Sequence, residues 1–280
     1  MGAKTCLVAQ VQGDARGILS GYPDMQESTT TNFVASLFPD ARFGAPQATD
    51  LSHTYLSDKS VIAGCTPGLG IVVSAEVAMD RPSELPRKFI AEKGTTILHA
   101  MHSVVDWFAF AVWEDGVLIR SLSVAPDDGV IEDIGARLDF EKPYWDGLHP
   151  AVDPGEELDD YPLPFHPLEL GEAALREFFG FQMEGFIDST LLEPERIRMF
   201  RFEDPTVASA TPRGDRTQTL FGTVAFGALM LPCFLGALTI LRLPAEEAPS
   251  WLIGVGVVLL LAGFWVFAVC VRSVRHAAGR

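Results

Sequence analysis

The stretch that decides the fold is residues 95–124, TTILHAMHSVVDWFAFAVWEDGVLIRSLSV. It contains three apolar runs, Thr95–Met101, Asp106–Trp113 and Val117–Val124, separated by polar residues. Asp115-Gly116 between two apolar runs is a strong signal for a β-hairpin. The run from Asp106 to Trp113 is apolar at almost every position, so we expect a strand that is buried on both faces at the centre of a sheet.

Further strands are predicted on both sides of this segment. They are expected at Lys4–Val11, Val61–Cys65, Ile71–Val77 and, as an edge strand, Arg196–Phe202. Helices are expected at Thr29–Phe38, at Glu84–Glu92 with Ser83 as its cap, and at Pro167–Phe179 with Gly180 as its stop. Residues 125–167 show no clear period and are predicted to be irregular. This mixture indicates an α+β fold with a mainly antiparallel sheet and a few flanking helices.

Two apolar runs follow this domain. Thr219–Leu241 has 23 residues without a charge, and Trp251–Val271 has 21. A helix of ~20 apolar residues crosses the ~30 Å hydrocarbon core of a bilayer. The nine residues 242–250 between the runs include two prolines, as suits a tight connection. We therefore predict a C-terminal two-helix transmembrane hairpin.

Arginines set the expected orientation of the hairpin. They flank it on both outer sides, and basic flanks stay on the cytoplasmic side of a membrane. Both termini and the N-terminal domain are therefore expected inside. The predicted organisation is a domain at 1–202, a linker at 203–218, transmembrane helices at 219–241 and 251–271, an extracytoplasmic loop at 242–250 and a basic tail at 272–280.

The charge of the chain is concentrated in the N-terminal domain. The whole chain has a formal net charge of −16 and a mean hydropathy of +0.20. Only four basic and two acidic residues follow Arg216, which leaves −18 for residues 1–216. Such acidity argues against nucleic acid as a partner and predicts repulsion from an anionic leaflet. The expected partners are the membrane, through two spans, and either another protein or a second copy bound through the hairpin.

His99, His102 and Asp106 form the first candidate site. Zinc favours histidines with a carboxylate, but on a strand residues three apart point to opposite faces. The alternative is a turn in which these side chains satisfy backbone groups. Cys65, where a strand meets a turn, is a candidate nucleophile with a histidine as its base; burial as a small hydrophobe is its alternative.

Two loops are further candidates. The acids around Asp127-Asp128-Gly129 could hold a hard cation, although their spacing does not fit an EF-hand and acidic turns are common. Tyr144, Trp145 and His149 share one loop, and exposed aromatic residues are typical of a partner or ligand face. The alternative is that Tyr144 and Trp145 cover the sheet.

Standard catalytic and nucleotide-binding motifs are absent. The sequence has no P-loop, G-x-G-x-x-G, G-x-S-x-G or C-x-x-C, and no cofactor is predicted. The favoured hypothesis is a non-enzymatic interaction or regulatory module. A metal- or thiol-dependent hydrolase that uses His99, His102, Asp106 and Cys65 is the main alternative. A membrane pore or transporter subunit is a third, although the spans have no ionisable residue.

Five segments resemble a known family. They are MGAKTCL (1–7), DRPSELP (80–86), LHAMHSVVDWFAFAVWEDG (98–116), RSLSVAPDDGVIEDIG (120–135) and YPLPFHPLELGEAALREFFGF (161–181). Over most of residues 1–202 the chain is similar to an uncharacterised actinobacterial family, a domain of unknown function. The resemblance implies a bacterial cytoplasm, and hence the plasma membrane for the hairpin. It implies no activity, cofactor or substrate.

Overall fold

The computed structural model describes residues 3–151, 161–185, 188 and 190–203. The chain divides after Ser209 into two units, and the described residues all belong to the first. The two predicted spans, the loop between them, the basic tail and nearly all of the predicted linker lie outside the described residues. Within the described part, every helix is too short or too polar to cross a bilayer.

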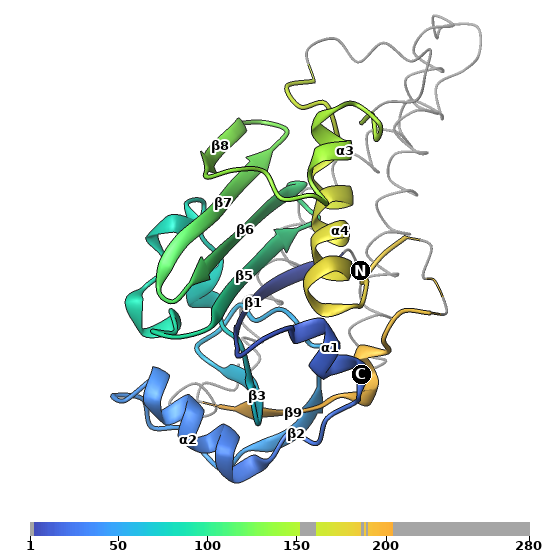
Figure 1. Cartoon of the computed structure of the whole chain (residues 1–280). Helices are drawn as coiled ribbons and strands as arrows, with labels where there is room; N and C mark the ends of the chain where they lie inside the picture. Colours follow the sequence, from blue (N-terminus) through green and yellow to red (C-terminus); the bar gives the residue numbers. More distant parts are fainter. Residues whose placement is uncertain (1–2, 152–160, 186–187, 189, 204–280) are drawn as a thin grey trace, which may run out of the picture. The chain divides into compact units, whose positions relative to one another are not determined.

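The domain is built on one nine-stranded sheet with the order β2-β9-β3-β4-β1-β5-β6-β7-β8 (Figure 1). The strands are β1 (Lys4–Val11), β2 (Gln47–Asp50), β3 (Val61–Thr66), β4 (Leu69–Val73), β5 (Thr95–His102), β6 (Trp107–Glu114), β7 (Val117–Ala125), β8 (Gly129–Ile134) and β9 (Arg198–Phe202). Every neighbouring pair among them is antiparallel. The predicted α+β class with a mainly antiparallel sheet is confirmed.

Helices cover both faces of the sheet (Figure 1). They are α1 (Ala15–Ser20), α2 (Glu27–Leu37), α3 (Lys142–Trp145) and α4 (Pro167–Phe179), with 3₁₀ turns η1 (Ala75–Val77), η2 (Pro82–Glu84), η3 (Arg87–Phe89) and η4 (Pro194–Arg196). Helix α4 lies on β5 and β6, where Gly171 allows close approach to Met101 and Phe108. Helix α2 lies on the opposite face, with the Phe33 ring against Gly70. We call these the α4 face and the α2 face.

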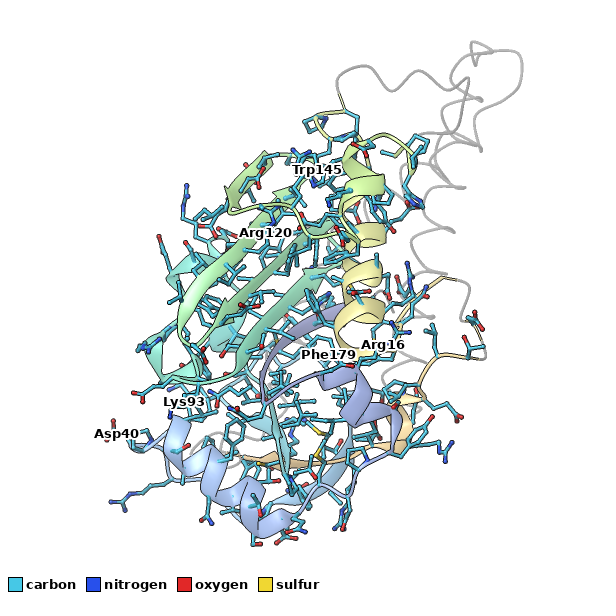
Figure 2. All side chains as sticks on the ribbon, in the orientation of Figure 1. Arg16, Asp40, Lys93, Arg120, Trp145 and Phe179 are labelled. Atoms are coloured by element: carbon cyan, nitrogen blue, oxygen red, sulfur yellow. The ribbon has the colours of Figure 1, made fainter. Side chains whose placement is uncertain are left out.

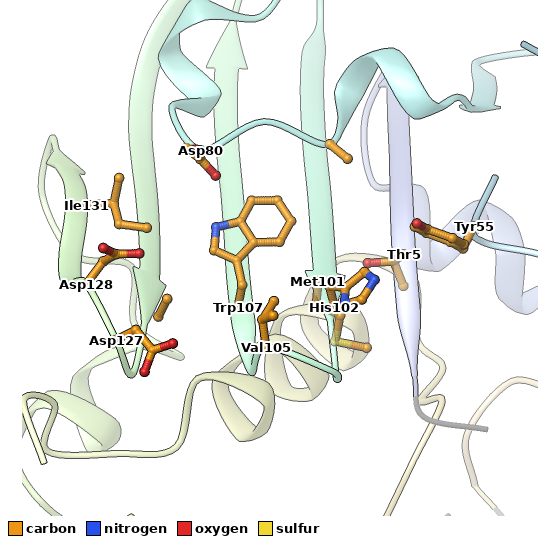
Figure 3. Close-up of a pocket in the computed structure, with 12 residues that line it drawn as sticks. Thr5, Tyr55, Asp80, Met101, His102, Val105, Trp107, Asp127, Asp128 and Ile131 are labelled. Atoms are coloured by element: carbon orange, nitrogen blue, oxygen red, sulfur yellow. The ribbon is translucent and has the colours of Figure 1, made fainter. Parts of the chain in front are cut away.

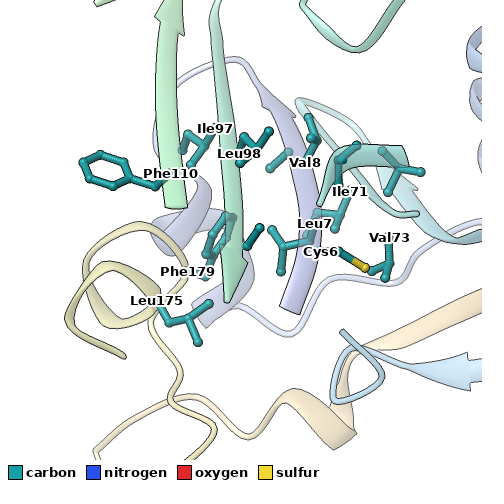
Figure 4. Close-up of a cluster of buried hydrophobic side chains, with 14 of the residues drawn as sticks. Cys6, Leu7, Val8, Ile71, Val73, Ile97, Leu98, Phe110, Leu175 and Phe179 are labelled. Carbon is teal, nitrogen blue, oxygen red and sulfur yellow. The ribbon is translucent and has the colours of Figure 1, made fainter. Parts of the chain in front are cut away.

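The core follows the apolar strands that the sequence predicts. All seven residues of β6 from Trp107 to Trp113 are buried, as expected for a strand covered on both sides. Figure 4 shows part of this cluster, with Phe110 of β6, Leu175 and Phe179 of α4, and residues of β5, β1 and β4. The middle strand of the nine is β1, however, and β6 is third from the β8 edge.

Helix α4 has the predicted bounds because local chemistry sets both ends. The His166 Nδ1 accepts the backbone N–H of Leu168 at 3.3 Å, and Pro167 stands in the first turn, where no N–H is needed. At the other end Gly180 has a φ of +79° and donates its N–H to carbonyls of the last turn. Such a left-handed cap favours glycine.

The predicted helix at Glu84–Glu92 is wrong. The segment instead contains the short turns η2 and η3, with Pro86 between them, and a proline cannot donate the N–H that would close a turn. Ser83 does not cap a helix, since its N–H and hydroxyl both donate to the carboxylate of Glu132, at 3.0 and 2.6 Å. A contact across 49 residues of sequence overrides the local signal.

Other boundaries also differ from the prediction. The strand expected at Ile71–Val77 ends at Val73, because Ser74 caps η1 and its hydroxyl accepts the N–H of Glu76. The segment 125–167, predicted to be irregular, contains β8 and α3. Strand β9 is not at the edge, because β2 pairs with its outer side.

A buried arginine ties the segment after β8 to the sheet. Arg120 of β7 is fully buried and labelled in Figure 2. Its guanidinium donates two hydrogen bonds to the buried carboxylate of Glu141, at 2.9 and 2.6 Å, and others to Asp133 and to the carbonyl of Ile134. Two parallel bonds to one carboxylate are the strongest form of this pair.

Candidate functional site

A pocket of about 510 Å³ opens on the α2 face at one end of the sheet (Figure 3). It lies where β5 ends and β6 begins, so the paired residues His102 and Trp107 both line it. The turn between β7 and β8 closes one side, and Tyr55 and the segment after η1 contribute further walls. Its volume is in the range of sites for small molecules, roughly 300–1,000 Å³.

Trp107 forms the centre of this pocket. The side chain is nearly buried, and the indole Nε1 donates a hydrogen bond of 3.1 Å to the hydroxyl of Ser123 on β7. The ring is therefore held in one orientation without a ligand. Figure 3 shows the indole in the middle of the pocket, with side chains from several segments around it.

Three aspartates stand around that indole. Figure 3 shows the carboxyl groups of Asp127 and Asp128 on the side of the pocket toward β8 and that of Asp80 above the indole. Asp127 and Asp128 occupy the β7–β8 turn, where Gly129 has a φ of +66°. Within the described residues, none of the three carboxylates forms an ion pair or a side-chain hydrogen bond. All three are exposed residues on the rim of the pocket, and their carboxylates are not neutralised by a basic side chain of the described part.

The opposite wall is formed by two rings. His102 and Tyr55 meet edge to face with ring centroids 5.8 Å apart, and the Lys4 ammonium lies 5.3 Å from the centre of the Tyr55 ring. Burial, together with the charge of Lys4, lowers the pKa of His102 below its ordinary value. His102 is therefore neutral at pH 7.

His99 lies on the other face of the sheet from His102. It is completely buried; its Nδ1 is 2.8 Å from the hydroxyl of Thr5, and its Nε2 is 2.9 Å from the carbonyl of Gly171. A carbonyl only accepts, so Nε2 carries the proton and Nδ1 accepts from Thr5. Burial lowers the pKa of His99 to about 4. Both nitrogens of a neutral ring are occupied, which leaves neither for a metal ion.

Asp106 faces neither of these histidines. It has a left-handed backbone with a φ of +48°, and its carboxylate lies 3.7 Å from Nε2 of His166. His166 is the cap of α4, on the opposite side of the sheet from the pocket. Among the described residues, no group of three or more His, Cys, Asp or Glu side chains is arranged to hold a metal ion.

Cys65 is remote from His99, His102 and Asp106. Cys65 pairs with Gly70 of β4, and the register continues through Gln10 of β1 to Thr96 of β5, which is six residues from His102 along that strand. At ~3.3 Å per residue this is about 20 Å along the strand, with β4 and β1 also between. Burial raises the pKa of the Cys65 thiol, which opposes formation of the nucleophilic thiolate. The four residues of the predicted hydrolase site are not brought together.

The aromatic loop is used largely for internal packing. Tyr144 is buried, stacks on His149 with centroids 4.3 Å apart and meets Phe165 edge to face. Trp145 packs on Phe165 at 4.9 Å, and the Arg137 guanidinium lies 4.0 Å over its ring. Burial also raises the pKa of Tyr144. His149 is the exposed member of the three.

Only part of the pocket can be predicted from the sequence. His102 and the Asp127-Asp128 turn are candidates there, but for separate metal sites. Trp107 stands within an apolar strand, and nothing in the sequence places Tyr55 or Asp80 near it. The available signal is that Trp107 is the second residue of one predicted strand, while Asp127 and Asp128 follow a few residues after the end of the next.

The fold and the pocket define a class of protein: an α+β domain with one antiparallel sheet and an open, ligand-sized pocket at one end of it. The model of a family of unknown function (DUF6928) matches residues 5–202, and the chain belongs to this family. The match runs from the second residue of β1 to the last residue of β9, so it covers all nine strands except Lys4. Neither a curated protein nor a solved structure gives a match.

Proposed function

We propose that this protein is a non-enzymatic binding module that a C-terminal two-helix hairpin holds at the cytoplasmic side of the plasma membrane. The observation that carries the proposal is the pocket around Trp107. It has the volume of a small-molecule site, and its central ring is fixed by Ser123 before any ligand arrives. A preorganised site loses less conformational entropy on binding.

Binding is favoured over catalysis because the candidate catalytic groups occupy different places. His99 is buried and neutral on the α4 face, His102 lines the pocket, and Cys65 lies beyond β4 and β1. A nucleophile and its base must lie within hydrogen-bond reach, ~2.6–3.2 Å. The hydrolase that uses Cys65, His99, His102 and Asp106 therefore remains the less favoured hypothesis.

The anchor rests on the sequence after the domain. Two uncharged runs of 23 and 21 residues, flanked by arginines, support a hairpin with both ends inside. Six glycines in the spans, residues 222, 227, 236, 254, 256 and 263, allow close helix contact. Self-association through the hairpin is part of the proposal, since it would give an assembly several equivalent pockets.

The test uses the full chain in a non-ionic detergent and measures thermal unfolding against a library of small metabolites. Ile131→Trp fills the pocket, and Ile119→Trp makes the same change at an exposed site toward the other end of β7. We expect a ligand to raise the Tm of the native protein and of Ile119→Trp, but not of Ile131→Trp. At 100 times its Kd the ligand adds ~2.7 kcal/mol, or roughly 5–10 °C.

Two outcomes would overturn the proposal. One is that every ligand found stabilises Ile131→Trp as much as Ile119→Trp, because the pocket would then not be the site. The other is turnover of a compound that depends on Cys65 or His102, which would make the protein an enzyme.

A further inference from the structure

We infer that the pocket takes a small organic cation, an ammonium group that lies on the indole of Trp107 between the carboxylates of Asp80, Asp127 and Asp128. The inference rests on the proposed function, since it names the class of ligand for the same pocket. Two independent features carry it: the fixed aromatic ring at the centre and the unneutralised charge around it.

The charge on this side of the pocket has one sign. Asp80, Asp127 and Asp128 have no ion pair in the described part of the chain, and the neutral His102 does not compensate them. The Lys4 ammonium lies against Tyr55 on the opposite wall. An anionic ligand would meet three carboxylates, whereas a cation would be attracted by all of them.

The ring at the centre suits the same ligand. Trp has the most favourable aromatic face for a cation, and aromatic surfaces are a common way to recognise ammonium groups. The Ser123 bond holds the indole so that the carboxyl groups stand around it in Figure 3. Tyr55 already has Lys4 over its ring, so Trp107 is the available platform.

The size of the pocket favours an organic cation over a metal ion. A bound Ca²⁺ or Mg²⁺ needs several oxygens at ~2.0–2.6 Å from one point. No group of three acidic, histidine or cysteine residues in the described structure meets that condition, the three aspartates of the pocket included. Carboxylates that are spread around an indole match a larger cation, whose charge is distributed over several methyl or methylene groups.

The experiment is isothermal titration calorimetry of the full chain in a non-ionic detergent at low salt, with choline and spermidine as separate probes. Choline tests a quaternary ammonium and spermidine a polyamine. The control for choline is 3,3-dimethylbutan-1-ol, which has the same shape without the charge. We expect at least one cation to bind, and the neutral alcohol to bind at least tenfold more weakly than choline if choline is that cation.

Variants locate the site. Asp127→Asn with Asp128→Asn should weaken binding of the cation roughly 5- to 30-fold, from two lost charge interactions. Asp24→Asn with Asp40→Asn makes the same change of net charge at exposed aspartates outside the pocket. This control pair should change the affinity for the cation less than twofold. Trp107→Leu should weaken binding roughly 5- to 20-fold and Trp107→Phe less, because Phe keeps an aromatic face.

The outcomes separate this inference from the proposed function. If neither cation binds, but a neutral or anionic compound binds and is lost in Ile131→Trp, the ligand class is wrong and the pocket is still a binding site. Equal weakening by the two aspartate pairs would also overturn the inference, because the effect would then come from net charge. Near-UV circular dichroism identifies any variant that fails to fold, and the aspartate pairs decide the question even if Trp107→Leu does not fold.

Discussion

Acid should destabilise the domain through His99, and the size of the effect follows from its environment. Burial lowers the pKa of His99 to about 4, from an ordinary value of 6.5. An unfolded chain therefore takes up a proton near pH 6.5, while the folded domain resists it down to about pH 4. Stability that is fully present above pH 6.5 is lost as the pH falls through this window. At ~1.36 kcal/mol per pKa unit, the loss is about 3 kcal/mol.

The titration of Glu172 of α4 has the opposite effect on the pH dependence of stability. Burial raises its pKa to about 7 from 4.5, although its carboxylate accepts the backbone N–H groups of Met183 and Glu184 at 2.8 and 3.0 Å. Between pH 4.5 and 7 the unfolded chain releases a proton that the folded domain retains, so stability falls as pH rises. This loss is also about 3 kcal/mol. In the native protein the two effects nearly cancel between pH 4.5 and 6.5.

Single variants should therefore show slopes of opposite sign. His99→Gln keeps one donor and one acceptor, and with Glu172 still present it should be more stable at pH 5 than at pH 7.5. Glu172→Gln should be less stable at pH 5 than at pH 7.5, and the double variant should be nearly flat. The measurement is the unfolding midpoint of the full chain in detergent by near-UV circular dichroism. Between pH 5 and pH 7.5 the expected difference in stability is about 2 kcal/mol for each single variant, or roughly 4–8 °C; parallel profiles for the two single variants would refute the reasoning.

Three further predictions concern the rest of the chain. Glu141→Ala leaves the buried Arg120 guanidinium without its main partner and should lower the unfolding free energy by ~3–5 kcal/mol. Asp133→Asn changes a side chain with a third of its surface exposed and should lower it by under ~1 kcal/mol. Equilibrium denaturation of the two variants measures both values. Gly135→Ala places a Cβ 2.0 Å from the carbonyl oxygen of Ile119 and should prevent or severely weaken folding, while Gly147→Ala, with a similarly positive φ but nothing within 4 Å, should cost ~1–2 kcal/mol on thermal denaturation. In a background without the native cysteines, Ala245→Cys should react with a membrane-impermeant maleimide added outside intact cells, and Ala277→Cys only after permeabilisation; the reverse pattern would contradict the proposed topology.

The sequence predicts this fold best where local chemistry decides it. Helix α4 begins and ends as expected because His166, Pro167 and Gly180 each act within a few residues of their own position. Strands β1, β5, β6 and β7 are recognisable because long apolar runs and the Asp115-Gly116 turn leave few alternatives. The order of the strands in the sheet cannot be predicted in this way, because it depends on pairing between distant segments. The sequence places β6 at the centre, whereas the central strand is β1.

Where long-range contacts decide, local signals were misleading. Ser83 has the sequence context of a helix cap, yet the carboxylate of Glu132 on β8 takes both its N–H and its hydroxyl. Strand β8 is short and half exposed, and its apolar residues Val130, Ile131 and Ile134 do not alternate with polar ones, so no strand pattern marks it. The acidic residues of β8 have a structural role that only their partners reveal. Glu132 also accepts a hydrogen bond from Ser121, and Asp133 accepts one from Arg120.

The candidate site depends on the same long-range pairing. Trp107 and His102 lie side by side because β5 and β6 form a hairpin, and the register of β7 and β8 brings Asp127 and Asp128 to the same end of the sheet. Sequence spacing suggested His99 with His102, but a strand sends these two rings to opposite faces. Single residues could therefore be suspected from the sequence, but not which of them meet.

The negative net charge of the domain also affects how a cation would reach the pocket. A charge of −18 over residues 1–216 raises the concentration of cations near the surface, most strongly in concave places. Asp80, Asp127 and Asp128 would concentrate that field at Trp107, whereas the same charge opposes contact with anionic lipid. A domain tethered to a membrane that repels it would keep its pocket open to the solution. The general charge would then speed the arrival of a cation, and the three carboxylates and the indole would determine how tightly it stays. Added salt should therefore slow association more than it speeds dissociation, because screening acts mainly beyond the ~8–10 Å Debye length.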